Sequence, residues 1–179
     1  SLNTVAVAAL RTTQIAAITT AQAVALVDAT LTALTSSQIG ALTTSAVAVL
    51  NYDSLAALLT DQVRALTTAQ IVGLTTQQVS ELNTKTLTAL STKQIVALET
   101  RDIAVLSYES LNALKTEQLQ ALSSSQIAGL SSQQLNDLAS TLGLARGLLQ
   151  RTQQLSLGDA IFLHPRNHAI TVIADGGER

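Results

Sequence analysis

The chain has 179 residues and a formal net charge of −2 at pH 7, with 47% hydrophobic, 2% aromatic and 12% charged residues. The absence of Cys excludes a disulfide framework, a thiolate metal site and a cysteine nucleophile, and the slightly acidic balance gives no electrostatic footprint for nucleic acid or an anionic membrane. No apolar run approaches the roughly 20 residues of a membrane span, and no basic segment followed by an apolar one opens the chain as in a signal peptide.

An eight-residue repeat runs through most of the chain. A Leu recurs at every eighth position from Leu2 to Leu138, with Ile18 filling the one gap. Three positions before the later Leu the chain carries Val, Ile or Leu, with Ala23 as the exception, and directly before them it carries mostly Ala or Gly. The unit therefore reads Leu, Thr/Ser/Asn, Thr/Ser, variable, Gln, Ile/Val/Leu, variable, Ala.

Neither one long helix nor one long strand fits this period. A helix turns about 100° per residue, so a spacing of eight winds the Leu position around the helix instead of keeping it on one face. In a strand, odd separations between the Leu and Ile/Val positions place them on opposite faces. Each repeat must therefore contain a bend.

Each bend carries the signals of a helix start. The residue after Leu is Thr, Ser or Asn in twelve of seventeen repeats, and Gln follows three positions later in ten, as in Thr35 with Gln38 and Thr67 with Gln70. This is the capping box, in which the hydroxyl accepts the N–H of the third helical residue and the Gln side chain accepts the N–H of the cap. In the same frame, Leu and Ile/Val form the pair of a hydrophobic staple. We predict one helix of about two turns per repeat.

The predicted fold is mainly α, with residues 1–140 forming a solenoid of short helices, one per eight-residue repeat, joined by corners. Leu, Ile/Val and Ala point inward and the variable positions point outward, and small residues beside Leu let neighbouring coils approach closely. Single helices this short are marginal in water, so stability must come from stacking. The pattern leaves open whether a coil holds three or four repeats.

Residues 141–179 are predicted to cap the array. Gly143 and Arg146 stand in the positions of Ile and Leu, and apolar residues at helical spacing predict a longer amphipathic helix from Gln133 onward. Two apolar segments around the only Pro predict a β-hairpin within 155–174, which we expect to fold back over the last helix and close the solenoid. The alternative is an open strand edge that pairs with another chain.

Residues suited to chemistry are few. His164 and His168, with Asp159 and Asp175 nearby, are potential metal ligands, but both His lie at the predicted hairpin turn, where solvation explains them. No Ser/His/Asp set suits nucleophilic catalysis, because both His lie near the C-terminal end of the sequence and the many Ser and Thr are accounted for as helix caps. We therefore predict no catalytic residue, no metal site, no cofactor and no enzymatic activity.

Two tyrosines are the candidate contact residues. Tyr52 and Tyr108 replace the usual Thr in nearly identical surroundings, and they are separated by seven repeats. They either fill corners of the array or form a paired contact site on its surface. Charged residues of both signs occupy the outward position of nearby repeats, where solvation explains them: Asp53, Asp61, Lys85, Lys93, Arg101, Glu109 and Glu117.

Individual repeats are similar to those of a known kind of protein. Leu66–Gly73 (LTTAQIVG) and Leu34–Ala41 (LTSSQIGA) resemble the Leu-Thr-Thr-x-Gln-Ile/Val-x-Ala arrays of very large, repetitive bacterial surface or secreted proteins of the adhesin type. The resemblance covers residues 2 to about 138. It implies an extracellular or cell-surface location and a role as stalk or spacer, and it transfers no binding residue.

Three functions remain open. The first is a non-enzymatic structural segment, serving as stalk, spacer or filament part of a large bacterial surface or secreted protein. The second is a protein-binding scaffold that uses a solenoid face, Tyr52, Tyr108 or the terminal hairpin. The third is an ice- or carbohydrate-binding surface of stacked Thr, which the capping role of those hydroxyls disfavours. Because the repeat is in register from Leu2 and the chain contains no Met, we expect its partners to be flanking repeats of a longer parent chain, with a protein partner or self-association as further possibilities.

Overall fold

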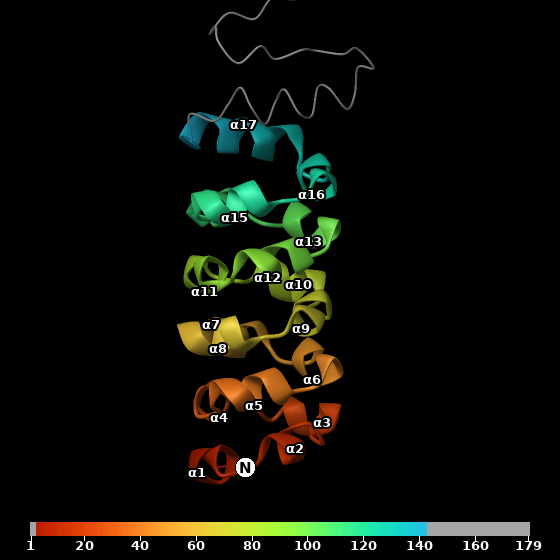
Figure 1. Ribbon diagram of the computed structural model, residues 1–179, viewed down its shortest axis with the longest axis vertical. Helices are drawn as coiled ribbons and strands as arrows, with labels where there is room; N and C mark the ends of the chain where they lie inside the picture. The colour runs from red at the N-terminus through yellow and green to blue at the C-terminus, as the bar shows by residue number, and fades with distance from the viewer. Residues whose placement is uncertain (1–2, 143–179) are drawn as a thin grey trace, which may run out of the picture.

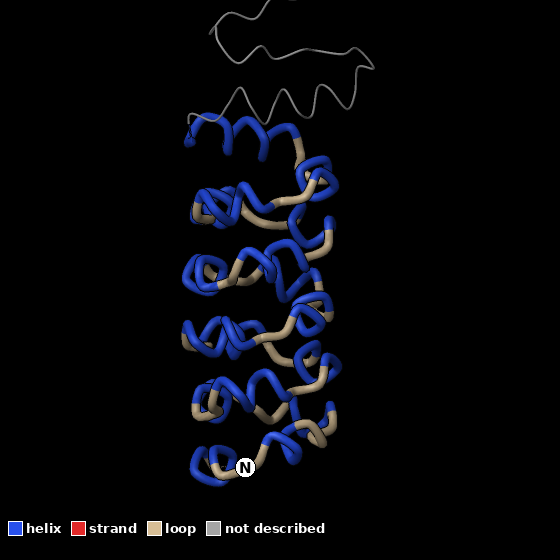
Figure 2. Tube along the Cα trace, viewed as in Figure 1, coloured by secondary structure: helices blue, strands red, loops and turns tan. Residues whose placement is uncertain are grey.

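The computed structural model describes residues 3–142, which form one stack of short helices with no strand in that range (Figures 1 and 2). The helices follow one another around a common long axis, from α1 at one end to α17 at the other. The helical solenoid predicted from the repeat is confirmed within these residues. The predicted hairpin, within 155–174, lies outside the described residues, as does nearly all of the predicted cap, 141–179.

Every described helix begins at the second position after the Leu, or Ile18, that opens its repeat. The bounds are α1 Thr4–Ala8, α2 Thr12–Ile15, α3 Thr20–Ala23, α4 Asp28–Thr32, α5 Ser36–Ala41, α6 Thr44–Ala48, α7 Tyr52–Ala57, α8 Thr60–Ala65, α9 Thr68–Val72, α10 Thr76–Ser80, α11 Thr84–Ala89, α12 Thr92–Ala97, α13 Thr100–Ala104, α14 Tyr108–Ala113, α15 Thr116–Ala121, α16 Ser124–Ala128 and α17 Ser132–Leu142. The predicted helix starts are therefore confirmed. The longer helix predicted near the end of the array is α17, which begins just before Gln133.

The helices before α17 are shorter than the two turns expected. They have four to six residues each, because the corner takes up part of every repeat. Leu42, Leu58 and Leu90 follow the last helical residue with ψ angles of 138° to 141°, a conformation that ends the helix and turns the chain. The next residue, the N-cap, is also extended, so each repeat leaves room for little more than one helical turn.

Side-chain caps hold the corners as predicted. The hydroxyl of Thr67 accepts the N–H of Gln70 at 3.2 Å, and Gln70 accepts the N–H of Thr67 at 2.7 Å. Arg11, Leu59 and Lys115 have no cap bond of their own. Even there, the Gln three positions later accepts the backbone N–H of the cap residue, at 2.8 to 2.9 Å. The Gln half of the capping box therefore holds the corner where the hydroxyl half is missing.

The Leu and Ile/Val positions form one continuous core along the stack. Ile39, Ile71 and Ile95 have at most 1% of their surface exposed, and the Leu of the inner coils are buried with them. The inward assignment of the Ala before Leu holds only in part, since residues such as Ala41 and Ala97 pack against the core but are only partly buried. The physical reason is their place as the last helical residue, where the chain turns and one side of the residue faces solvent.

One coil takes slightly more than three repeats. Most helices pack against the helix three places later, as α5 does on α8 and α12 on α15, while α11 packs on both α7 and α8. Hydrogen bonds between coils join residues 26 to 31 positions apart, because donor and acceptor occupy different positions of their repeats, as Gln38 and Leu10 do in repeats that start 24 residues apart. The packing of α11 on two helices shows that the coils drift slowly around the axis as the stack grows.

Close approach between coils explains the Gly residues beside Leu. A Cβ placed on Gly73 would overlap the Cγ2 methyl of Thr44 in the coil below, and Gly129 stands in the same relation to Thr100. Gly73 has a φ of −80°, which any residue adopts, so its own backbone does not require Gly. The prediction that small residues allow the coils to approach is confirmed at these two positions.

Candidate functional site

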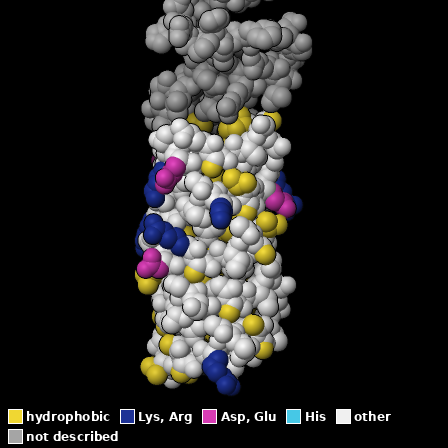
Figure 3. Space-filling model, in the orientation of Figure 1, with side chains coloured by type: hydrophobic (Ala, Val, Ile, Leu, Met, Phe, Trp, Pro, Cys, Tyr) yellow, Lys and Arg dark blue, Asp and Glu magenta, His cyan; other side chains and the backbone are white. Residues whose placement is uncertain are grey.

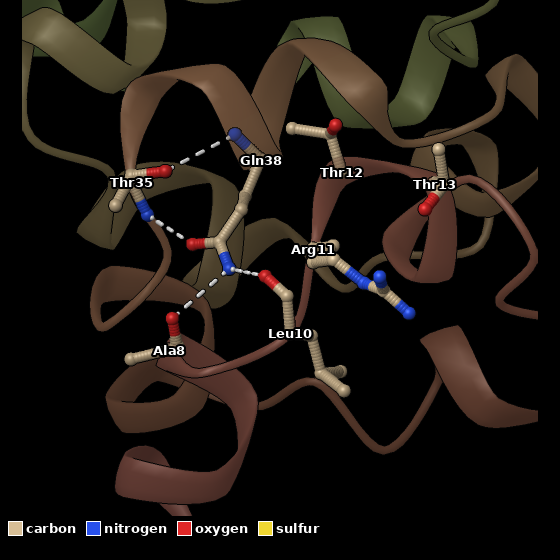
Figure 4. A pocket seen from close by; sticks show the side chains of 7 residues that line it. All are labelled: Ala8, Leu10, Arg11, Thr12, Thr13, Thr35 and Gln38. Carbon is tan, nitrogen blue, oxygen red and sulfur yellow. Dashed lines mark hydrogen bonds between the residues drawn. The ribbon is translucent and has the colours of Figure 1, made fainter.

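A row of buried Gln side chains joins each coil to the one below. Gln38, only 3% exposed, accepts the N–H of Thr35 through its side-chain oxygen at 2.7 Å. Its amide nitrogen donates to the carbonyl oxygens of Leu10 at 2.6 Å and Ala8 at 3.2 Å (Figure 4). The first N–H groups and the last carbonyl groups of a helix have no hydrogen-bond partner within that helix. The Gln38 side chain thus bonds an N–H at the start of its own helix and a carbonyl at the end of a helix one coil away.

The same arrangement recurs along the stack. Seven further Gln donate to the carbonyl oxygen of the Leu 28 positions earlier, at 2.7 to 2.9 Å: Gln62, Gln70, Gln78, Gln94, Gln118, Gln126 and Gln134. The sequence predicted only the capping bond within each repeat. The bond from the Gln amide to the coil below depends on the number of repeats per coil, and that number cannot be deduced from the spacing of the repeat.

Asp102 is one of the residues that replace Gln in this row, and the only charged one in the described chain. It occupies the Gln position of α13, is 0% exposed, and is the one ionisable residue in the buried core of the described chain. Its carboxylate accepts the N–H of Glu99 at 3.2 Å and the hydroxyl of Thr76 at 3.0 Å, and Arg101 Nε lies 3.8 Å from it. A carboxylate has no N–H to donate, so the amide donor that Gln provides to the coil below is missing here.

Asp102→Gln should raise the free energy of unfolding by about 1 kcal/mol, because it restores donors for the carbonyls of Ile71 and Leu74 and removes a buried charge. Chemical denaturation followed by circular dichroism measures the change. Asp102→Asn is the matched control, since it removes the charge with a side chain too short to reach those carbonyls. A Gln variant no more stable than the Asn variant would contradict the bonding scheme.

Tyr52 and Tyr108 lie on the surface as the first residues of α7 and α14. They are 46% and 50% exposed. Both helices pack against α11, so the repeats between the two tyrosines carry the chain around the axis about twice and return it to the same side. The structure thus places the pair on one side of the stack with α11 between them, and a contact role for the pair stays a prediction.

A longer period of seven repeats accounts for the pair and is visible in the sequence. Residues 47–82 (VAVLNYDSLAALLTDQVRALTTAQIVGLTTQQVSEL) align without a gap on residues 103–138 (IAVLSYESLNALKTEQLQALSSSQIAGLSSQQLNDL). The exposed tyrosines recur in this alignment, as do the two Gly residues at the close coil contacts. The internal duplication thus shows in the sequence that each exposed tyrosine is followed, at the same distance, by a Gly that makes a close contact between coils.

The outward charges are exposed as expected, and they are sorted by coil. Asp53 and Asp61 stand on α7 and α8, the basic residues stand on α11 to α13, and Glu109 and Glu117 stand on α14 and α15. The basic residues are Lys85, Lys93 and Arg101. Figure 3 shows basic and acidic side chains close together along the edges of the stack. At this one position of the repeat, successive coils therefore carry acidic, basic and again acidic residues, while Arg64, Glu81, Glu99 and Lys115 at other positions add charges of the opposite sign to the same coils.

A shallow pocket of about 540 Å³ lies between α2 and α5. It is lined by Ala8 and Leu10 together with the side chains of Arg11, Thr12, Thr13, Thr35 and Gln38. The amide of Gln38 is already bonded to the backbone, and the Arg11 side chain points away from it (Figure 4). The pocket therefore shows no set of converging groups that would fix a ligand.

The described part of the chain offers neither a metal-binding cluster nor a membrane-spanning helix. No group of three His, Cys, Asp or Glu residues lies close enough there to hold a metal ion. None of the described helices has the length and apolar character needed to cross a bilayer. The potential metal ligands His164, His168, Asp159 and Asp175 lie outside the described residues.

Comparison with known proteins finds a match to one repeat family. The ALTTAQ repeat family matches residues 47–84 and 108–140, two stretches that include Tyr52 and Tyr108 and that overlap the duplicated segments. No curated protein and no solved structure matches the chain. The family matches support a tandem repeat array, in agreement with the helix-by-helix regularity of the stack.

Proposed function

We propose that this chain is a non-enzymatic structural segment that serves as stalk, spacer or filament part of a large bacterial surface or secreted protein. The observation that carries the proposal is the row of buried Gln side chains. Their oxygen and nitrogen atoms are consumed in joining successive coils, as Gln94 does by bonding Ser91, Val63 and Leu66. The most regular polar groups of the repeat thus build the stack and leave little for binding a small molecule.

The architecture suits a spacer because the stack can become longer without becoming wider. Each coil bonds and packs only with its neighbours, so added repeats extend the stack along its axis, as in other solenoids. The bacterial surface or secreted setting rests on the resemblance of units such as Leu66–Gly73 to adhesin-type arrays. Flanking repeats of a longer parent chain are then the natural neighbours of its two ends.

A protein-binding scaffold is the second candidate function. It is favoured by the two exposed tyrosines on one side of the stack, since Tyr is enriched among residues that dominate protein interfaces. A surface of Thr for ice or carbohydrate receives less support, because cap hydroxyls such as those of Thr67 and Thr75 already accept backbone N–H groups.

Duplicating the seven repeats of the segment 43–98 inside the chain tests the spacer role. Neighbouring layers of helices pack about 10 Å apart, so the two added coils should lengthen the particle by about 20 Å at constant cross-section. Small-angle X-ray scattering gives both dimensions, and melting temperature reports whether the added coils join the stack. An increase in cross-section without added length would contradict a spacer, and loss of binding to a surface partner on Tyr52→Ala with Tyr108→Ala would favour the scaffold.

A further inference from the structure

We propose that the face formed by α11 and α14 is a self-association surface, on which two copies of this chain pack side by side and antiparallel. The inference goes beyond the structural role proposed above, because a spacer functions equally well as a monomer. Two stacks would then lie side by side, in contact through the C-terminal half of the described array.

Exposed groups of three kinds lie on or beside α11 and α14. Tyr108 is 50% exposed, and Val105, at the corner just before α14, is 41% exposed. Lys85 stands at the second position of α11 and Glu109 at the second position of α14, and both are exposed. A half-exposed Tyr with a neighbouring Val supplies an apolar anchor, and the two opposite charges supply a polar rim, which is the usual composition of a protein interface.

The charges together with Tyr108 select the arrangement of the two copies, since Asp61 of α8 also stands three repeats from Lys85 but α8 begins with Thr60 and offers no tyrosine. A two-fold axis midway between α11 and α14 places Lys85 of each copy on Glu109 of the other, so that one contact is made twice. An axis through α11 itself would place Lys85 against Lys85, which is repulsive. The two-fold axis also makes the copies antiparallel and closes the pair, so no open filament results.

The second copy is favoured over an unlike partner because the chain carries both halves of the complementary pattern. Lys85 lies in the first turn of its helix, where the helix dipole disfavours a cation. Within residues 3–142 Lys85 has no ion pair, since the described salt bridges involve Arg101. Asp61 and Glu109 stand at the same helix position three repeats before and after Lys85 but form no ion pair with it, and the two-fold axis brings Glu109 of a second copy to it.

Asp53 supplies a matched comparison. It stands at the same helix position as Glu109, and α7 also packs against α11. However, Asp53 lies four repeats from Lys85, whereas only three repeats separate Lys85 from Glu109. The α7 helix is thus displaced from the register that α11 and α14 share, and it lies outside the proposed surface.

Sedimentation equilibrium of the full chain at low and high salt tests the proposal. We expect a dimer whose dissociation constant rises with ionic strength, because exposed charges are screened. Lys85→Glu and Glu109→Lys should each raise the dissociation constant at least about tenfold, and the double exchange should restore it, since it rebuilds the pair with opposite signs. Lys85→Glu places an anion where the helix dipole favours one, so its effect is not a folding defect.

Two further variants sharpen the test. Tyr108→Ala should also raise the dissociation constant at least about tenfold through loss of the anchor, with circular dichroism showing an unchanged fold. Asp53→Lys should leave it within about twofold, as expected for an exposed charge outside the interface. A chain that stays monomeric at millimolar concentration, a double exchange that fails to restore association, or equal weakening by Asp53→Lys would each overturn the proposal.

Discussion

Gln78→Ala should lower the free energy of unfolding by about 3 kcal/mol, whereas Gln77→Ala, at the preceding residue, should change it by less than about 0.5 kcal/mol. The two side chains are chemically identical and differ in their place. Gln78 is 5% exposed and bonds the N–H of Thr75 and the carbonyls of Val47 and Leu50. Gln77 is exposed.

The loss at Gln78 is large because several backbone groups in two coils lose their partners at once. An unpaired buried donor or acceptor costs roughly 1 to 3 kcal/mol, and the shortened side chain leaves a cavity as well. Denaturant titration measures both variants against the unchanged chain. Equal stability of the two variants would mean that the bonds between coils contribute nothing to folding, and the account of the Gln row would fail.

Leu74→Asp should disrupt the stack locally and cost several kcal/mol. Leu74 is 4% exposed within the continuous core, and an ionised carboxylate has no partner among its aliphatic neighbours, so ionisation there is strongly unfavourable. We expect amide hydrogen exchange to accelerate first in α9 and α10 and in the helices packed on them. The effect should then fade with distance along the stack, because coupling is between neighbours.

Gln77→Lys is the control for the core substitution. It also introduces a charge in the repeat that Leu74 opens, but on the solvent side, and should change stability by less than about 0.5 kcal/mol. Similar exchange patterns in the two variants would show that the assignment of inward and outward positions is incorrect.

The features that the sequence predicts well are those decided within one repeat. The start of α9, for example, follows from Thr67 and Gln70, whose hydroxyl and amide satisfy each other's backbone N–H groups. The burial of Leu66 and Ile71 follows from the same frame through the hydrophobic staple. Helix length was overestimated because the extended conformation of Leu at the corner is not encoded in the apolar spacing.

The features that the sequence does not predict depend on how many repeats complete a coil. The bonds of Gln94 to Val63 and Leu66, 31 and 28 positions earlier, require that number, as does the meeting of Asp102 with Thr76. The placement of Tyr52 and Tyr108 on one side of the stack requires it too. Asp102 was not singled out from the sequence because its role appears only when its position is compared with that of Gln in the neighbouring coils.

The uniform partners of the Gln row also bear on how such a gene changes in length. Nearly every repeat has a Leu carbonyl at the same place facing the coil above. When one repeat is deleted or duplicated in the gene, each Gln amide therefore still finds a Leu carbonyl as its acceptor, and the core stays buried. A change that is not a whole number of repeats moves Leu out of the core in all later repeats. Pairs with individual partners, such as Gly73 with Thr44, are separated by a single-repeat change. Unequal recombination that moves the seven-repeat unit as a block keeps such pairs together, which fits the gapless internal duplication of this chain.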